Sequence, residues 1–441
     1  MIPQLQRETT VSAPEDTSSW SLATRIGFRF IFCYFILYVY PRSVGSLGAF
    51  VKYNNPLRDL WHVVVPWVGA NVLHLAGPFT EIANGSGDQI YDYVLLFCIA
   101  MVAAVAAGIW SILDRKRTDY RVLYQWLRIL VRMIVAVAMI SYGLNKLYRM
   151  QFAEISYARL VDSYGRTSPM GLLWAFMGAS HAYSFFAGVG ETLGGVLLIL
   201  PQFTVIGSLV TLAVMSNVLM LNLCYDVPRK IYSIHLILFC MFLLLPDMWQ
   251  MAKFFVFKRP AQLTSPTPLF KDNLLNKGVW LLQLVIGISA LVVCGVQAHT
   301  DQVKNETFLP TPIRGIWTVE EFVMDNQVHP PLMTDTQRWQ RVILDSPELL
   351  TIQSMDGDQQ QYYLQLSPEK KRFTMYEFEA PHKNASFDFD NPDPDRMTLQ
   401  GTTIDGHQIT ANMRRMDLSD PRQFLLINRG LHWVNAFPFR R

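Results

Sequence analysis

The stretch from Gly278 to Val323 contains the two kinds of sequence pattern found in this chain, an apolar run and an alternating one. It begins GVWLLQLVIGISALVVCGVQA (278–298), without one charged residue. After His299 it continues through the polar linker TDQVKNETFLPTP (300–312), and then reads IRGIWTVEEFV (313–323). A bilayer core about 30 Å thick needs roughly 20 apolar residues in a helix, whereas the alternation after the linker has the period of a β-strand. The sequence therefore predicts a membrane part followed by a water-soluble tail.

The two parts differ in charge. The whole chain of 441 residues is 51% hydrophobic and 17% charged, with a net charge of +3. Residues 1–312 carry 24 basic and 17 acidic residues, and residues 313–441 carry 14 basic and 18 acidic residues. Charge density is about half that of a typical soluble protein in the first part and about equal to it in the second. This composition excludes a disordered chain, a collagen-like fibre and a lone soluble domain, and neither part is basic enough to indicate a nucleic-acid partner.

The membrane part is expected to be a bundle of seven helices. We expect a polar disordered tail over residues 1–20, a helical membrane domain over 21–299, the linker over 300–312 and an extracytoplasmic β domain over 313–441. The lipid bilayer is thus an expected partner, because only a helix satisfies its own backbone in lipid. The predicted spans are Ser21–Tyr40, Tyr93–Leu113, Ile129–Tyr148, Ala182–Leu200, Phe203–Tyr225, Ile231–Gln250 and Gly278–Ala298.

Basic residues in two connectors predict the orientation. The loop after the second span reads DRKRTDYR (114–121). Because cytoplasmic loops carry an excess of Lys and Arg, this connector, the one before the last span and the N terminus are predicted to be cytoplasmic. Seven spans then place the β domain outside. The second connector contains Lys253, Lys258, Arg259, Lys271 and Lys277.

One apolar loop complicates this topology. Trp61–Gly77 is short and contains Pro66, so we predict a half-buried interfacial or re-entrant element. If it crossed the bilayer instead, the sidedness of everything after it would invert.

The tail is expected to form an all-β domain. Eight or nine short runs, separated by turn sequences such as MDGD (355–358), favour a closed antiparallel barrel or a sandwich. Gly315-Ile316-Trp317 resembles the G-x-W that begins lipocalin barrels, and we predict a lipocalin-like barrel. Such a barrel either encloses one small apolar ligand or is filled by its own side chains. The runs are Ile316–Val323, Trp339–Leu344, Leu349–Met355, Tyr362–Leu366, Phe373–Phe378, Ala385–Phe389, Arg396–Gly401, Gln408–Met413 and Phe424–Asn428.

Polar residues within the spans are the functional candidates, because charge inside a membrane is expensive. At a rise of 1.5 Å per residue, acidic, basic and amide groups from four helices fall in the outer half of the membrane. Five isolated cysteines and the absence of a C-x-x-C pair give no sign of a metal or dithiol site. The candidate catalytic residues are Lys146, Glu191, Asp226 and His235, and the candidate binding residues are Asn145, Asn217, Asn222 and His181.

Glu191 is the most specific of these candidates. It lies in GVGETLGG (188–195), where Gly188, Glu191 and Gly195 share one helical face. Small residues let a neighbouring helix approach closely, so the carboxyl is expected in a protein interior rather than in lipid. A cationic partner is one expectation there, and Lys146 is a candidate for it. The alternative is an ion pair or a hydrogen bond between helices with a purely structural role.

Three stretches resemble the DoxX family of small bacterial membrane proteins. They are YGLNKL (142–147), GVGETLGG (188–195) and LNLCYDVP (221–228) with the following SIH (233–235), and the similarity covers about residues 125–250. The ending NRGLHW (428–433) is similar to that of longer DoxX-like proteins. This chain departs from the compact four-helix form of the family by its added spans and its barrel. The resemblance implies a bacterial inner membrane and an association with quinone-linked thiosulfate oxidation and oxidative-stress complexes.

A second, more distant resemblance concerns Lys146. The string GLNKL (143–147) is similar to the Gly-Leu-x-Lys-Leu stretch that supplies a catalytic lysine in the transmembrane domain of vitamin K-dependent γ-carboxylases. In those proteins a β-rich lumenal region follows the membrane part. This resemblance implies that Lys146 acts as a base.

Three functions follow as hypotheses. The leading one is a DoxX-like membrane oxidoreductase, or a component of one, whose outer-half cleft around Lys146, Glu191, Asp226 and His235 engages a quinone or another small lipophilic molecule. Since the sequence carries no haem, flavin, iron–sulfur or zinc motif, electrons would come from a partner protein or a bound substrate. The first alternative is a non-enzymatic membrane-anchored protein whose barrel binds a lipid or small molecule. The second is γ-carboxylase-like chemistry with a lysine base.

Overall fold

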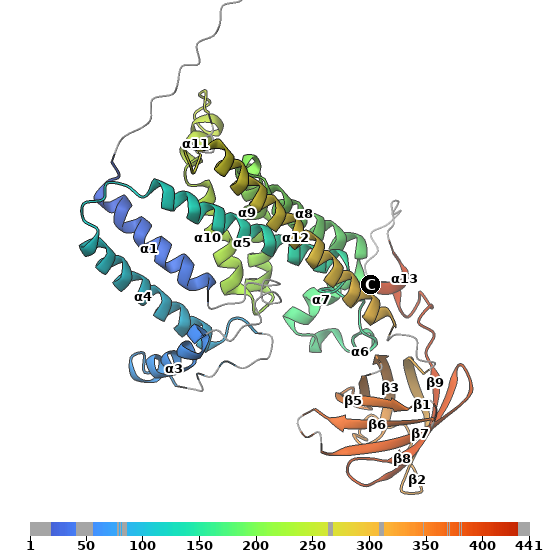
Figure 1. Ribbon diagram of the computed structural model, residues 1–441. Coiled ribbons are helices and arrows are strands. Elements are labelled where there is room, and N and C mark those ends of the chain that lie inside the picture. Colours follow the sequence, from blue (N-terminus) through green and yellow to red (C-terminus); the bar gives the residue numbers. More distant parts are fainter. Residues whose placement is uncertain are drawn as a thin grey trace, which may run out of the picture. The chain divides into compact units, whose positions relative to one another are not determined.

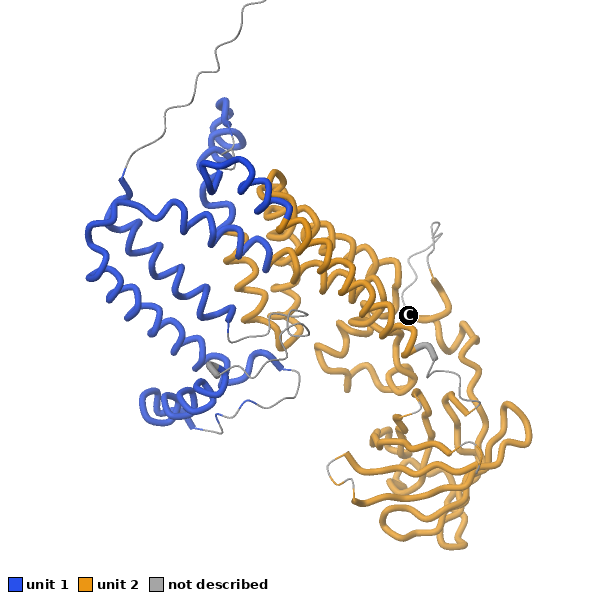
Figure 2. Tube along the Cα trace, viewed as in Figure 1, with its two compact units in different colours: residues 1–134, 242–281 blue, residues 135–241, 282–441 orange. Residues whose placement is uncertain are grey.

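The computed structural model describes residues 19–40, 56–76, 79, 81, 86–262, 268–307, 313–346, 348–367, 369, 371–378, 380 and 382–430. The chain divides into two compact units, Met1–Ile134 with Phe242–Leu281, and Val135–Met241 with Leu282–Arg441 (Figure 2). The division runs through three helices, α5 (Arg121–Leu147), α10 (Lys230–Leu244) and α12 (Asn273–Thr307).

The first unit contains a helical layer from the N-terminal part of the chain (Figure 1). Helices α1 (Leu22–Val39) and α4 (Ile90–Leu113) pack along each other, and the shorter α3 (Pro56–Asn71) packs against α4. The contact between α3 and α4 is apolar, with Trp61 and Val65 buried against Tyr91 and Leu95. Helix α3 covers most of the loop expected at Trp61–Gly77, and it is too short to count among the candidate spans.

A buried arginine holds α1 to the chain that follows α4. Arg29 is 2% exposed, and its guanidinium donates to the Tyr120 hydroxyl at 2.7 and 2.9 Å, the Ser111 hydroxyl at 2.8 Å and the Asp114 carbonyl at 2.9 Å. The Tyr120 hydroxyl in turn donates to the Asp114 carboxylate at 2.8 Å. A buried charge is tolerated when it is hydrogen-bonded in this way, so the network fixes the packing of α1.

The second unit contains the helices between α5 and α10, parts of α5, α10 and α12, and the β domain. After α5 come α6 (Tyr157–Leu160), the 3₁₀ turn η1 (Tyr164–Arg166), α7 (Pro169–Ala179) and α8 (His181–Ile199). The turn η2 (Pro201–Phe203) then leads into α9 (Thr204–Cys224), which packs along α8. Ser168 and Ser180 cap α7 and α8 through hydrogen bonds to the amides of Gly171 and Tyr183.

Six of the seven predicted membrane spans are confirmed as single helices. Among the described residues six helices are long and apolar enough to cross a membrane, or seven if the bent pair α10 and α11 (Met248–Phe255) forms one span. The chain is therefore an integral membrane protein. The prediction of one continuous helix over Ile231–Gln250 was wrong, because α10 ends at Leu244 and α11 departs from its axis by 78°. Pro246 lies at this break, where it has no amide hydrogen to continue the helix.

The β domain is a closed antiparallel barrel, as predicted. Eight described strands pair in chain order, and β9 pairs with β1 to close the circle, whereas the short β2 (Gln327–Val328) pairs with β1 alone. Closure matters because a barrel has no exposed strand edge. The eight strands are β1 (Gly315–Met324), β3 (Trp339–Ser346), β4 (Leu349–Ser354), β5 (Gln359–Ser367), β6 (Arg372–Glu377), β7 (Asn384–Asp393), β8 (Arg396–Thr402) and β9 (Gln408–Arg415).

Large aromatic side chains fill the inside of the barrel. Trp317, Phe322, Phe373 and Phe387 are each at most 1% exposed and belong to one apolar cluster. The indole of Trp317 donates to the carbonyl of Ile313 at 2.8 Å, which satisfies its only polar atom. The tryptophan of the G-x-W sequence is therefore part of the barrel core.

The ends of the domains differ in part from the sequence predictions. The ninth run, Phe424–Asn428, was wrong as a strand: it contains the short helix α13 (Leu425–Asn428), because pairing of β9 with β1 already closes the barrel. Helix α12 continues to Thr307, past the start of the expected linker. Most of the tail predicted over residues 1–20 lies outside the described residues, as do residues 431–433 of NRGLHW.

The barrel is seated on the segment around α6, within the second unit. Ala158 of α6 packs against Ile316 and Ile343 of the barrel. The Asp345 carboxylate accepts a hydrogen bond from the amide of Tyr157 at 2.8 Å, and it lies 3.9 Å from the Arg314 guanidinium. Burial raises the pKa of the Asp345 carboxyl, although the Tyr157 amide and Arg314 act in the opposite direction. Asp345 therefore combines a docking hydrogen bond with a charge that is costly to bury.

Because Asp345 is both a hydrogen-bond acceptor and a buried charge, we expect its Ala and Asn variants to differ in stability. Asp345→Ala is expected to lose about 1–3 kcal/mol, because the Tyr157 amide loses its buried acceptor. Asp345→Asn keeps an acceptor and removes the charge, so at neutral pH it should be at least as stable as the wild type. Because the pKa is higher in the folded state, the cost of the ionised carboxyl applies above that pKa and disappears as the pH falls through it.

Melting of the full chain in detergent measures both effects. The advantage of Asp345→Asn over wild type should shrink from about pH 7 towards about pH 4, where an unfolded Asp is itself half protonated. Faster hydrogen exchange around Tyr157 in Asp345→Ala alone would locate the effect at the seat. An advantage that grows on acidification would contradict this account.

Candidate functional site

A buried ion pair joins α5 and α8. The Lys146 ammonium lies 2.6 Å from the Glu191 carboxylate, and the two residues are 6% and 2% exposed. The predicted partnership of these residues is thus present in the structure. In a charge-assisted hydrogen bond of this length each charge neutralises the other, which makes both tolerable in an apolar interior.

Small residues make the close approach of the two helices possible. A methyl group at Gly188 would lie 2.8 Å from the Gly143 carbonyl oxygen and 3.0 Å from the Lys146 Cβ, and one at Gly195 would lie 2.7 Å from the Ala136 carbonyl oxygen. The two distances to carbonyl oxygens are shorter than a side-chain carbon permits. The face that carries Gly188, Glu191 and Gly195 therefore packs against α5, as the spacing in GVGETLGG predicted.

Aromatic rings surround the Lys146 ammonium. Its nitrogen lies 5.8 Å from the centre of the Tyr142 ring and 5.7 Å from that of Phe152, both within the range of cation–π attraction. Phe152 packs edge-on against Trp174 of α7 at 5.2 Å, and Tyr142 contacts Tyr232 of α10 at 5.7 Å. The pair thus lies beside flat aromatic rings, which were not among the residues predicted from the sequence. Tyr142 was detectable, because it lies one helical turn before Lys146.

The other two candidate catalytic residues make different contacts. Asp226 pairs with Lys230 at 3.0 Å, and its side chain is 84% exposed. His235 is buried, and its Nδ1 lies 2.7 Å from the carbonyl oxygen of Ile231, one turn earlier in α10. Since that carbonyl can only accept, Nδ1 carries the proton in this contact. Asp226 and His235 thus contact Lys230 and Ile231, whereas Lys146 and Glu191 contact each other.

The candidate binding residues are dispersed. Asn222 is buried and donates to the Ser233 hydroxyl at 2.8 Å, which ties α9 to α10. Asn145 is half-buried, one residue before Lys146, whereas Asn217 is exposed. His181 is exposed at the start of α8 and accepts a hydrogen bond from Arg149 at 2.8 Å. Asn145 is therefore the one of the four that adjoins the pair in sequence.

Three buried hydroxyls were not predicted. The side-chain oxygens of Thr192, Ser208 and Thr211 are buried without a hydrogen-bond partner among the described atoms. Thr192 follows Glu191 directly, and its amide lies 2.6 Å from the position of a methyl group at Gly143. A hydroxyl in such a place is a polar atom that a bound molecule or water can engage.

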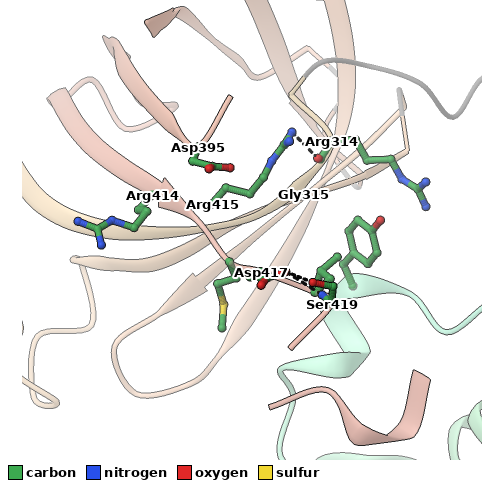
Figure 3. A pocket seen from close by; sticks show the side chains of 10 residues that line it. Arg314, Gly315, Asp395, Arg414, Arg415, Asp417 and Ser419 are labelled. Carbon is green, nitrogen blue, oxygen red and sulfur yellow. Dashed lines mark hydrogen bonds between the residues drawn. The ribbon is translucent and has the colours of Figure 1, made fainter. Parts of the chain in front are cut away.

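An open pocket of about 530 Å³ lies at one end of the barrel (Figure 3). Arg415 stacks on the Trp317 ring at 4.9 Å and donates to the Arg314 carbonyl at 2.8 Å, while Arg314 stacks on the Tyr157 ring at 4.8 Å. These arginines are held by neighbouring rings and carbonyls. The sequence analysis missed the pocket because only the folded barrel brings residues near 314 and 415 together. Its lining also includes Asp395, Arg414, Asp417 and Ser419.

Metal-binding side chains are not clustered in the part of the chain that the structure describes. Within those residues no group of three or more His, Cys, Asp or Glu side chains is placed to hold a metal ion. Cys98, Cys240 and Cys294 are buried, and none of the three is in a disulfide within the described residues. The helical site contains the Glu191 carboxylate, the Lys146 ammonium and the Tyr142 phenol.

Comparison with known proteins gives one informative match. No known protein-family profile matches the chain, and no solved structure matches it. Over 116 residues, which are 26% of this chain and 73% of the relative, it is 31% identical to a protein of Bacillus subtilis (strain 168) described as "Uncharacterized protein YwoB". The chain, with its membrane helices and closed barrel, belongs to the family of this uncharacterised protein YwoB.

Proposed function

We propose that this protein is a membrane oxidoreductase, or the membrane component of one, in which the Lys146–Glu191 pair exchanges protons with a quinone or a similar small lipophilic molecule. The observation that carries the proposal is the 2.6 Å ion pair buried between apolar helices. The resemblance of residues 142–147, 188–195 and 221–228 to the DoxX family supports the quinone as substrate class.

Stability alone gives little reason to keep this pair. Replacing a buried ion pair by apolar residues of similar volume is often neutral or stabilising, because desolvation of two charges offsets their attraction. Ionisable groups inside membrane segments accordingly mark sites of proton or substrate handling. The presence of two charges in this buried position favours a chemical role.

The residues present can handle protons and hold a flat ring. Reduction of a quinone takes up one proton for each electron, and a carboxylate beside an ammonium can accept a proton or pass one on. The rings of Tyr142, Phe152 and Trp174 offer apolar surface next to the pair. The electrons would be supplied by a partner protein or by an oxidisable substrate.

The orientation and the compartment belong to the same proposal. The basic connector at residues 114–121 and the cations between Lys253 and Lys277 support a cytoplasmic N terminus. The ion pair then lies towards the outer face of a bacterial inner membrane, and the barrel lies outside. The aromatic filling of the barrel favours the helices, rather than the barrel, as the place where a lipophilic molecule binds.

Redox-induced infrared difference spectroscopy tests this function without knowledge of the natural electron donor. The full chain is reconstituted with a short-chain ubiquinone analogue, and an electrode supplies the electrons. We expect a protonated-carboxyl band to change on reduction of the quinone in the wild type, because Glu191 takes part in the proton exchange. The band should be lost in Glu191→Gln.

Glu154→Gln is the matched control, because Glu154 is also paired with a cation, Arg149 at 2.8 Å, but its side chain is 76% exposed. That variant should keep the band. A wild type that binds the quinone but shows no carboxyl change, or a Glu191→Gln spectrum identical to the wild type, would contradict the proposal. Lys146→Arg keeps the charge and should shift the band rather than abolish it.

A further inference from the structure

We propose that α11 and the residues that follow it, through Arg259, form an anchor that lies in the plane of the membrane and binds anionic lipid headgroups. This inference is independent of the proposed redox function. It rests on the direction of α11, on its exposed aromatic residues and on its charge.

The direction of α11 is set by the break after α10. The two helices are bent by 78° at Leu245–Asp247. Helix α11 has 8 residues, so at 1.5 Å per residue it is about 12 Å long and reaches less than half-way across a bilayer core of about 30 Å. If α10 crosses the membrane, α11 runs nearly parallel to its surface.

The side chains of this segment suit the membrane–water interface. Six apolar residues are about half exposed or more, namely Met248 (48%), Trp249 (60%), Phe254 (60%), Phe255 (70%), Val256 (70%) and Phe257 (54%). Trp is enriched at the level of the lipid headgroups, and Trp and Phe are typical of the apolar face of helices that lie in the membrane interface. A soluble surface would leave this concentration of exposed rings unexplained.

The backbone folds these rings into one compact unit. Lys258 adopts a left-handed conformation with φ of 52°, which ends the helical path, and the Arg259 amide then donates to the Lys253 carbonyl at 3.0 Å. Phe257 is thereby placed edge-on against Trp249, with ring centres 5.9 Å apart. The reversal keeps the rings and the neighbouring cations in the same short segment.

The charge identifies the lipid class. Lys253 lies over the Trp249 ring at 5.6 Å, and Lys258 and Arg259 are exposed. The sequence from Met248 to Gln262 contains no acidic residue. Three cations beside exposed aromatic rings complement the phosphates of an anionic bilayer surface, and the apolar rings enter the adjoining acyl region.

Depth of the segment is measured on the full chain with a nitroxide label. The native cysteines are replaced by serine or alanine, Phe255→Cys carries the label, and Val328→Cys in the barrel, at a position 66% exposed, serves as the aqueous control. In vesicles containing phosphatidylglycerol, the label at 255 should be relaxed by oxygen and protected from a water-soluble nickel complex. Accessibility to nickel equal to that at 328 would overturn the proposal.

Lipid preference is measured by native mass spectrometry after partial delipidation from mixed phosphatidylcholine and phosphatidylglycerol. The variant Lys253→Gln/Lys258→Gln/Arg259→Gln should weaken phosphatidylglycerol retention by up to about fivefold for each cation removed. Lys371→Gln/Lys383→Gln/Arg396→Gln, which removes three exposed cations from the barrel, should leave it unchanged.

A salt titration of the wild type provides a measurement that needs no variant. Phosphatidylglycerol retention should fall as ionic strength rises, because salt screens the attraction between exposed charges. Retention that is insensitive to salt and to the triple substitution would overturn the lipid assignment and favour a protein partner at this surface.

Discussion

Replacing Glu191 by leucine while Lys146 remains is expected to destabilise the protein by about 3–5 kcal/mol, because it leaves an unpaired ammonium in a buried position. Lys146 is 6% exposed, and Glu191 is its acceptor at 2.6 Å. The double variant Lys146→Met/Glu191→Leu removes both charges at similar volume. It should recover most of the loss, and the unfolding midpoint of the detergent-solubilised protein measures both.

Glu154→Leu is the control for loss of an exposed pair. Its pair with Arg149 is exposed, so its removal should cost less than about 1 kcal/mol. If Glu191→Leu were as stable as wild type, or if the double variant were as unstable as the single one, the pair would not be energetically coupled. A double variant that folds but loses the infrared response would separate the chemical role of the pair from its contribution to folding.

Adding one methyl group at Gly143 is the second large effect expected. In Gly143→Ala the new carbon would lie 2.6 Å from the Thr192 amide nitrogen, 2.7 Å from the Gly188 carbonyl oxygen, and closer still to the Thr192 hydroxyl. Two of these atoms are backbone and cannot turn away, so α5 and α8 must separate. Overpacking of this kind costs about 1–3 kcal/mol, and thermal unfolding should show it.

The matched control is Gly108→Ala in α4, where a methyl group meets nothing within 4 Å. It should be neutral or stabilising by up to about 1 kcal/mol, because alanine is the better helix former. Gly143 is one turn before Lys146, so Gly143→Ala should also perturb the carboxyl band of Glu191. A Gly143→Ala protein as stable as Gly108→Ala would mean that the helices are not in close contact at this point.

Local sequence patterns determined the two-part architecture. A charge-free run such as residues 278–298 forms a helix in lipid, because only a helix satisfies its own backbone hydrogen bonds there. The alternation of apolar and polar residues after residue 313 gives a strand one apolar face, which must be buried. The Lys146–Glu191 pairing was also predictable, since a carboxyl on a face of small residues inside a membrane needs a cation. Each of these conclusions could be reached from one local segment, or from the energetic cost of burying one charged residue.

Tertiary structure decided the features that depend on distant segments. Pairing of β9 with β1 closed the barrel and left Phe424–Asn428 outside the sheet, although its composition suits a strand. Asp226 is exposed and pairs with Lys230, and the His235 Nδ1 contacts a carbonyl of its own helix, so similar depth in the membrane did not by itself decide which residues pair. Helical rise gives the depth of a residue but not its direction around the bundle, and that direction is fixed only when the helices pack.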